Sequence, residues 1–224
     1  MDNASKDVLF IIAMQLDLPT LLRWCQSSAR INKNVCNNDN LWRSKLMKDY
    51  PDYQNFNLEK SMKETYVFMY QLSYIKRKMN SDESLHDIFL KEKINFVGMK
   101  IKKVPAFDLP NLKKFHLSYN ELTEVPEFNL PNLELLSLSD NKLRKVPPFN
   151  YSNLKSLYLN HNNITEVPRF NLPNLEILAL TDNKLTRIPT FDFPNLQYLE
   201  LFNNPLAEEE KRKLKEKYGK KVKL

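Results

Sequence analysis

Hydrophobic and polar positions in the second half of the chain follow one fixed period. Asn111, Asn132, Asn153, Asn174 and Asn195 lie 21 residues apart, and a leucine follows each of them. From that leucine each turn reads LxxLxLxxNxL, with phenylalanine or isoleucine at two of the leucine positions. A period of this length predicts a solenoid, in which each turn adds one short strand to a parallel sheet and points two side chains of the LxL triplet into the core.

The last polar position of the pattern is always an asparagine. These residues are Asn120, Asn141, Asn162, Asn183 and Asn204. Where the chain leaves the sheet, its backbone amides and carbonyls need partners, and an asparagine side chain can both donate and accept. We therefore assign these residues to a structural asparagine ladder. The five matching turns resemble the leucine-rich-repeat family.

The outer side of each turn is rich in proline. A valine or isoleucine before proline is followed two residues later by phenylalanine, at Val125-Pro126, Val146-Pro147, Val167-Pro168 and Ile188-Pro189, with Phe128, Phe149, Phe170 and Phe191. Prolines at this density exclude a convex helix, so we expect extended backbone with the phenylalanines stacked inside. Thirteen prolines against two glycines also favour a backbone that avoids tight turns through positive φ.

The strand positions that alternate with the buried leucines should face solvent on the concave side of the solenoid. Several of them are apolar or aromatic, which is typical of a surface that binds a protein. The residues expected to contact a partner are Lys114, His116, Leu135, Tyr158, Asn160, Ile177, Tyr198, Glu200 and Phe202. The alternative is that these are scattered surface residues with no role.

The first half of the chain has helical spacing and no repeat. Apolar residues recur at Leu9, Ile12 and Leu16, and Pro19 is placed to begin a second helix. Further along, Ser61 can cap a helix that runs to about Met79, and Ser81 can cap a second one over residues 82–91. We expect several short helices around a small core.

The order of motifs in this half resembles an F-box over about residues 4–47. An opening helix is followed by Leu18-Pro19-x-Leu21-Leu22, a polar second helix and Asp39-Asn40-Leu41-Trp42. An F-box before leucine-rich repeats is similar to the substrate receptors of SCF-type cullin–RING ubiquitin ligases, and the short, Asn- and Lys-rich style is similar to F-box proteins of amoeba-infecting giant viruses. The resemblance implies that a Skp-family adaptor is bound by Leu9, Ile12, Leu16, Leu18, Pro19, Leu21, Leu22 and Trp42.

These observations predict an α+β chain in four parts. They are an F-box-like helical domain (1–49), a helical linker with the N-terminal cap of the solenoid (50–92), leucine-rich repeats (93–206), and a basic cap helix with tail (207–224). The predicted function is a substrate-recognition adaptor of a cullin–RING ligase, with an unknown protein as its target. The alternative is a protein-binding scaffold unrelated to ubiquitin, in which the helical segment only caps the solenoid.

The net charge of +7 does not change this picture. Residues 211–224 carry eight cations and one acid, so the rest of the chain is balanced, with 26 cations and 26 acids. A phosphate-binding face would need basic residues on the body of the protein, and nucleic acid is not an expected partner. We interpret the tail as part of a helix over residues 207–218, with Leu206, Leu214 and Tyr218 covering the end of the solenoid.

The remaining chemistry points away from an enzyme. The two glycines, Gly98 and Gly219, cannot form a phosphate-binding loop, and the longest apolar run, Val8–Met14, is too short to span a membrane. The candidate general bases are His86, His116 and His161, with no paired nucleophile, so we expect no catalysis, cofactor or metal. Cys25 and Cys36 form no CxxC motif, which argues against a zinc site or a disulfide framework and favours a reducing compartment, the cytoplasm or nucleus (of the host, for a viral protein).

Overall fold

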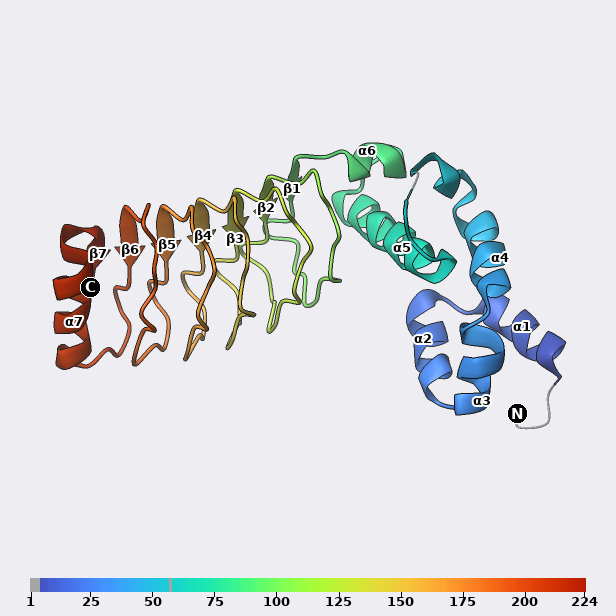
Figure 1. Cartoon of the computed structure of the whole chain (residues 1–224), viewed down its shortest axis with the longest axis horizontal. Helices are drawn as coiled ribbons and strands as arrows, with labels where there is room; N and C mark the ends of the chain where they lie inside the picture. Colours follow the sequence, from blue (N-terminus) through green and yellow to red (C-terminus); the bar gives the residue numbers. More distant parts are fainter. Residues whose placement is uncertain (1–4, 57) are drawn as a thin grey trace. The chain divides into compact units, whose positions relative to one another are not determined.

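The structure, a computed structural model, describes residues 5–56 and 58–224 and divides into two compact units. The helical unit comprises the residues up to Arg77 together with Ser81–Ile88, and the repeat unit comprises Lys78–Asn80 with Phe89–Leu224. Figure 1 shows short helices in the first unit and a row of parallel strands in the second.

The helical unit consists of short helices with side-chain caps. They are α1 (Lys6–Gln15), α2 (Leu18–Gln26), α3 (Ala29–Ile31), η1 (Asn32–Cys36), α4 (Asp39–Asp49), η2 (Pro51–Phe56), α5 (Met62–Met79) and α6 (Leu85–Phe89). Asp17 caps α2 by accepting from the amide of Thr20 at 2.9 Å. Ser61 and Glu64 form a reciprocal capping box, so α5 begins directly after Ser61 and ends at Met79, as the sequence predicts.

The last of these helices is shorter than expected. The predicted helix over residues 82–91 is wrong in extent, because α6 covers only Leu85–Phe89. Ser84 and Asp87 form its capping box, with the Asp87 amide donating to Ser84 Oγ at 3.1 Å. Ser81 instead accepts from the amide of Glu83 in the turn before the helix.

Trp42 and a buried lysine organise the core of the helical unit. Trp42 is buried beside the ring of Tyr66, and its indole Nε1 donates to the carbonyl of Cys36 at 2.7 Å. Lys45, one turn further along α4, is 2% exposed. Its ammonium donates to the carbonyl of Leu16 at 2.8 Å, lies 3.6 Å from the Asp49 carboxylate and lies over the ring of Tyr66. These partners compensate for the loss of water around the charge, although burial still lowers the pKa of Lys45.

Cys25 and Cys36 are joined by a disulfide, which corrects the sequence-based expectation. Cys25 lies near the end of α2 and Cys36 ends η1, and both are buried. The fold brings their Cα atoms to 5.9 Å, inside the range that a disulfide requires. A single disulfide between distant cysteines requires neither a CxxC pattern nor a framework of several bridges, so the absence of both did not exclude it. The cysteines therefore no longer support a reducing compartment.

The repeat unit is one seven-stranded parallel sheet with its strands in chain order. The strands are β1 (Lys93–Asn95), β2 (Lys114–His116), β3 (Leu135–Ser137), β4 (Ser156–Tyr158), β5 (Ile177–Ala179), β6 (Tyr198–Glu200) and β7 (Val222–Lys223). Residues that pair between β1 and β6 are 21 positions apart, as in Lys93 with Lys114 and Ile177 with Tyr198. Each turn of the sequence repeat therefore stacks in register on the one before.

Phenylalanines fill the interior opposite the sheet. Phe107, Phe128, Phe149, Phe170 and Phe191 are buried, and the rings of Phe170 and Phe191 stack with centroids 5.7 Å apart and planes 5° apart. Between β1 and α7 the described backbone contains no helix, so the proline-rich side is extended. The leucines of the LxL triplets and this phenylalanine column form one continuous core.

One column of residues contradicts the expectation that the backbone avoids positive φ. Each turn contains a residue in the left-handed region three residues beyond the end of its strand, with φ between 52° and 72°. The column is Gly98, Tyr119, Asp140, His161, Asp182 and Asn203. Asparagine, aspartate and histidine tolerate this conformation better than other non-glycine residues, which is how the chain makes these turns almost without glycine.

The ladder asparagines follow this column directly and satisfy the buried backbone. Asn162 Nδ2 donates to the carbonyls of Leu138, Leu159 and Asn160, and Oδ1 accepts from the amide of Leu143, all at 3.0–3.1 Å. The equivalent bonds are made by Asn120, Asn141, Asn183 and Asn204. Their side chains therefore hold consecutive turns together.

The C-terminus closes the repeat unit with a helix and a strand. α7 (Glu208–Tyr218) buries Leu214, and its Glu210 carboxylate accepts from the amide of Ile188 at 3.0 Å. Several cations of α7 pair with acids of the same helix, as in Lys213 with Glu209 at 2.7 Å. The sequence analysis missed β7, which pairs with β6 after the helix. The sequence pattern of this two-residue strand is weak, because Val222 is its one apolar and buried residue.

Candidate protein-binding surface

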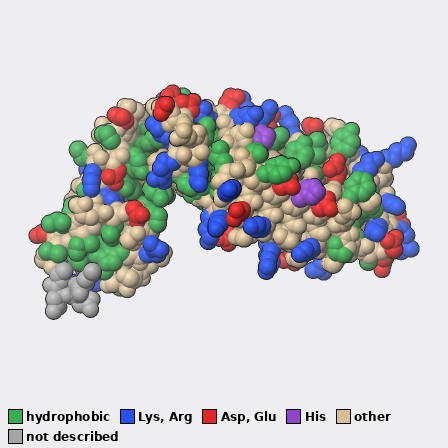
Figure 2. All heavy atoms as spheres, turned by 180° about the vertical axis from the view of Figure 1, so that it is seen from behind, with side chains coloured by type: hydrophobic (Ala, Val, Ile, Leu, Met, Phe, Trp, Pro, Cys, Tyr) green, Lys and Arg blue, Asp and Glu red, His purple; other side chains and the backbone are tan. Residues whose placement is uncertain are grey.

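The outward face of β1–β6, with the residue two positions beyond each strand, is called the sheet face below. It contains all nine residues predicted to contact a partner: Lys114, His116, Leu135, Tyr158, Asn160, Ile177, Tyr198, Glu200 and Phe202. None of the nine is fully buried, whereas the residue between each pair of outward strand positions is buried. The structure thus brings these side chains to one surface, on which Figure 2 shows hydrophobic groups among acids, lysines and histidines.

The C-terminal turns of the sheet face are largely apolar, with half-buried Glu200 as their one strand-borne charge. Tyr198 is 49% exposed and Phe202 is 45% exposed, both on the turn that contains β6. Ile177 lies beside Tyr198 in the register of β5 and β6, and half-buried Tyr158 lies on β4. Aromatic side chains left accessible on a rigid sheet provide contact area at small entropic cost.

The N-terminal turns of the sheet face are basic. Lys93 and Lys114 pair in the register of β1 and β2, and both are exposed. Neither makes an ion pair with any residue that the structure describes. His116, two residues beyond Lys114, has its pKa lowered by partial burial and by these two lysines. Lys93 is absent from the nine predicted contact residues, although its place in the column was readable from the period.

Between these two ends half-buried Leu135 lies among polar side chains, several of which are hydrogen-bonded within the repeat. The hydroxyls of Ser118 and Ser137 lie 2.6 Å apart, and Asn160 Oδ1 accepts from the amide of Thr181 at 3.0 Å. The predicted contact residue Asn160 is therefore engaged in the repeat itself. This leaves the side-chain Nδ2 of Asn160, and not its Oδ1, available to a partner.

The left-handed column forms the border of the sheet face. His161 Nδ1 lies 3.3 Å from the carboxylate of Asp182, and Asn203 donates to the other oxygen of Asp182 at 2.8 Å. Tyr119 is 64% exposed, which makes it the most exposed large hydrophobic residue of the described chain. A tyrosine in this backbone conformation is unusual, and the sequence analysis did not include it among the contact residues.

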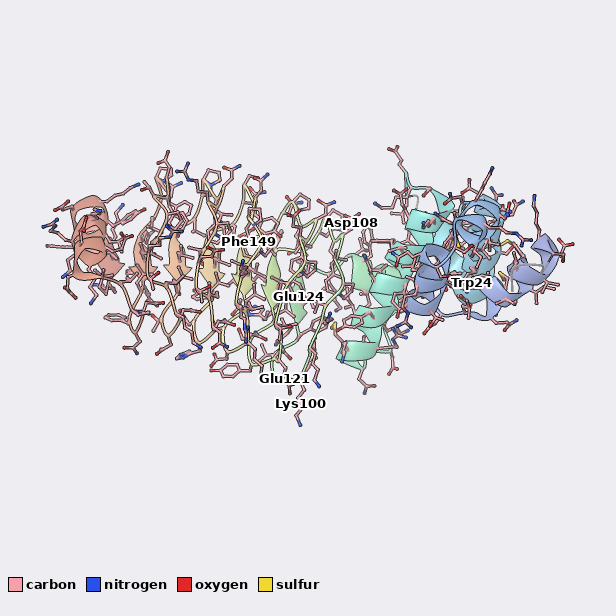
Figure 3. The ribbon with its side chains drawn as sticks, turned by 90° about the horizontal axis from the view of Figure 1, so that it is seen from below. Trp24, Lys100, Asp108, Glu121, Glu124 and Phe149 are labelled. Carbon is pink, nitrogen blue, oxygen red and sulfur yellow. A yellow bond between two sulfur atoms is a disulfide. The ribbon has the colours of Figure 1, made fainter. Side chains whose placement is uncertain are left out.

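Other columns carry charges that alternate from turn to turn. Lys113 pairs with Glu92 at 2.7 Å, and Lys155 pairs with Glu134 at 3.3 Å. Lys142 lies 3.7 Å from Glu121, which projects beside Lys100 at one edge of the turns in Figure 3. Because these charges are paired within the repeat, they leave the unpaired Lys93 and Lys114 as the distinctive cations of the sheet face.

The residues predicted to bind an adaptor are divided between core and surface of the helical unit. Leu9, Leu18, Leu21 and Trp42 are buried and shape the helices, so a docked protein cannot touch them without rearrangement; this corrects their assignment as contacts. Ile12, Leu16 and Leu22 are half-buried, and Pro19 is exposed. The buried residues were mistaken for contacts because apolar periodicity marks a helix face without saying what covers it.

Two exposed apolar residues on α1 were missed by the sequence analysis. Ile11 is 62% exposed and Val8 is 47% exposed, and they lie three residues apart on one side of the helix. Met47 on α4 is exposed as well. The signal in the sequence was the seven-residue apolar run Val8–Met14, which is too continuous for a helix with only one buried side.

The described residues form no group of three or more His, Cys, Asp or Glu side chains that could hold a metal ion. Among the described helices, none combines the length and the apolar character needed to cross a membrane.

The repeat segment matches known repeats. Residues 92–151 match a family model for two copies of leucine-rich repeats, and residues 152–206 match a leucine-rich-repeat model. Residues 92–206 are leucine-rich repeats. Neither match extends to residues 1–91.

Two solved structures match only part of this chain. YopM from Yersinia enterocolitica is 31% identical with a TM-score of 0.43, and the match covers 47% of this chain and 22% of that one. A leucine-rich-repeat protein of Leptospira interrogans is 27% identical with a TM-score of 0.39, covering 52% and 38%. This chain thus spans well under half the length of either protein. No curated protein matches the sequence.

Proposed function

We propose that this protein is a non-catalytic receptor whose repeats hold a target protein on the sheet face. The carrying observation is the pair of exposed aromatic residues, Tyr198 and Phe202, beside half-buried Ile177 on a rigid parallel sheet. Burying such residues in an interface supplies most of the binding free energy of typical protein complexes. Leucine-rich repeats are suited to protein binding because the stacked strands form an extended and rigid surface.

We propose further that the helical unit docks on a Skp-family adaptor, which would link the target to a cullin–RING ubiquitin ligase in the cytoplasm or nucleus. Support comes from the F-box-like order of motifs and from the apolar side chains that α1 leaves exposed, Val8 and Ile11. In this role the protein supplies proximity, because it holds the target near an enzyme that performs the transfer.

Calorimetry with a purified Skp-family adaptor tests the second part. Val8→Asp/Ile11→Asp should abolish binding, because it places two charges in an apolar contact without disturbing the core. Gln15→Asp is the matched control, since Gln15 is also exposed on α1 and carries no apolar surface. Leu18 is unsuitable for this test, because it is buried and its removal would unfold α2.

The outcomes separate the two roles. If the native chain binds the adaptor and the double variant does not, the ligase role is supported. If the native chain does not bind the adaptor at micromolar concentration, the ligase role is wrong and the protein is a scaffold unrelated to ubiquitin. The receptor role is tested separately, because a target recovered by the native chain should be lost with Tyr198→Ser/Phe202→Ser and retained with Val8→Asp/Ile11→Asp.

A further inference from the structure

The sheet face has two chemically different ends. Lys93, Lys114 and His116 lie on β1 and β2, whereas Ile177, Tyr198 and Phe202 lie on or just after β5 and β6. The serine and asparagine positions between them already make hydrogen bonds within the repeat. A ligand that contacts the whole face therefore meets positive charge at one end and, at the other, apolar surface around a half-buried carboxylate, Glu200, which also disfavours acidic residues of the ligand there.

Lys93 and Lys114 have no acidic partner within the described part of the chain, so their charges are available to a ligand. Several lysines elsewhere on the repeats pair with an acidic residue one turn away, as Lys113 does with Glu92 and Lys155 with Glu134, while others off the sheet face, such as Lys184, make no ion pair with the described residues. Lys93 and Lys114 instead face each other across β1 and β2, which leaves two like charges side by side. Like charges directly opposite on a sheet destabilise it, so a negatively charged ligand would relieve an unfavourable interaction that is present in the free protein.

The spacing between the two ends sets the length of such a ligand. Neighbouring strands of a sheet lie about 4.8 Å apart, so β2 and β5 are separated by about 14 Å and β1 and β6 by about 24 Å. An extended peptide at about 3.3 Å per residue covers this interval with roughly four to seven residues. A helix, at about 1.5 Å per residue, needs about 10 to 16 residues.

We infer that the sheet face selects a polypeptide segment of the target with acidic residues at one end and aromatic or aliphatic residues about 14–24 Å away. The inference rests on the proposed receptor role and names the chemistry of the partner. Acidic residues contact Lys93 and Lys114 and set the direction of the segment. The apolar residues pack on Ile177, Tyr198 and Phe202 and provide most of the affinity.

A phage-displayed library of random 16-residue peptides, selected on the immobilised full chain, tests the inference. The native protein should enrich peptides with Asp or Glu at one end and Leu, Ile, Phe, Tyr or Trp at the other. Lys93→Glu/Lys114→Glu should reverse the charge preference to Lys and Arg while keeping the apolar end. It should weaken binding of the native-selected peptides at least tenfold. Tyr198→Ser/Phe202→Ser should remove the apolar preference and keep the acidic one.

The matched control is Lys102→Glu/Lys184→Glu, which makes the same change in charge at two exposed lysines off the sheet face that form no ion pair with the described residues. It should select the same peptides as the native chain. If the native protein and the Lys93→Glu/Lys114→Glu variant select the same peptides, the inference is overturned while the receptor role stands. If no selected peptide responds to either sheet-face variant, or no peptide is recovered, both the inference and the receptor role fail. Thermal melting by circular dichroism checks that each variant is folded.

Discussion

The two units of this protein are held together in different ways. In the repeat unit each turn makes nearly the same contacts as its neighbours, such as the four hydrogen bonds of each ladder asparagine. In the helical unit the decisive contacts occur once each, namely the Cys25–Cys36 disulfide, the Trp42–Cys36 hydrogen bond and the partners of Lys45. The repeat unit gains its stability from repetition, and the helical unit depends on a few contacts without substitutes.

This difference decides how a residue's role can be judged. In the repeats, every residue has equivalents in the other turns, so a departure from the column is informative by itself. Lys93 and Lys114 stand out because two cations pair in register where lysines such as Lys113 and Lys155 have an acidic neighbour, and Tyr119 stands out because its column otherwise holds Gly, Asp, His and Asn. In the helical unit no such comparison exists, and only burial separates a core leucine from a contact residue.

The largest expected loss of stability comes from removing one asparagine of the ladder. Asn162→Ala leaves the buried amide of Leu143 without its partner and removes one of the two hydrogen bonds that each of three carbonyls accepts. It should lower the free energy of unfolding by about 3 kcal/mol. Asn174→Ala is the matched control, since Asn174 recurs at the same period but is exposed and donates one bond, to Ser152. It should change stability by about 1 kcal/mol or less. Equal losses in urea denaturation would show that the ladder is not the element holding the turns.

Much of this ladder was predictable, because period and residue type together specify it. The LxL triplets, the ladder asparagines and the phenylalanine column all occupy the positions that the 21-residue spacing predicts. Strand β7 was not predictable, since its two residues belong to no repeat and form a strand only because β6 offers an open edge. The left-handed column was also missed, because counting glycines ignores the tolerance of Asp, Asn and His for positive φ.

The helical unit was predictable in its elements and not in its contacts. The capping serine before α5 and the proline in α2 can be read from local sequence. The disulfide and the burial of Lys45 depend on how helices pack, which no local pattern contains. For the same reason the sequence could name apolar residues of an adaptor site and could not tell Leu9, which is buried, from Ile11, which is exposed.

The second prediction concerns the disulfide and should affect only the helical unit. Cys25→Ala/Cys36→Ala frees a loop with a sequence separation of 11, for which loss of the crosslink should lower stability by about 2–3 kcal/mol. Both tryptophans, Trp24 and Trp42, lie in the helical unit, so their fluorescence follows that unit alone. The native chain under reducing conditions should behave as the double variant does.

The repeat unit serves as the internal control for this change. Its transition, followed by circular dichroism of the sheet, should not move with reductant or with the cysteine substitutions. An unmoved tryptophan transition would mean that the crosslink does not support the helical unit. A moved repeat transition would mean that the two units unfold together, contrary to the comparison above.

The smallest effect tests whether departures from a column mark function. Tyr119 has φ of 58°, a conformation that asparagine adopts more easily, and its exposed ring leaves no cavity when removed. Tyr119→Asn should therefore raise the free energy of unfolding by about 0.5–1 kcal/mol. Tyr198→Asn is the control, because Tyr198 is exposed in a strand, where asparagine is unfavourable, and should lower stability instead. The reciprocal change Asn203→Tyr, at the equivalent position four turns later, should lower the free energy of unfolding. If the Tyr119→Asn variant is more stable than the native chain and also binds the target more weakly, Tyr119 contacts the partner, and the native chain retains a strained turn to provide that contact. A loss of stability would show that Tyr119 supports the repeat, and that an irregular residue in a column is not by itself a sign of function.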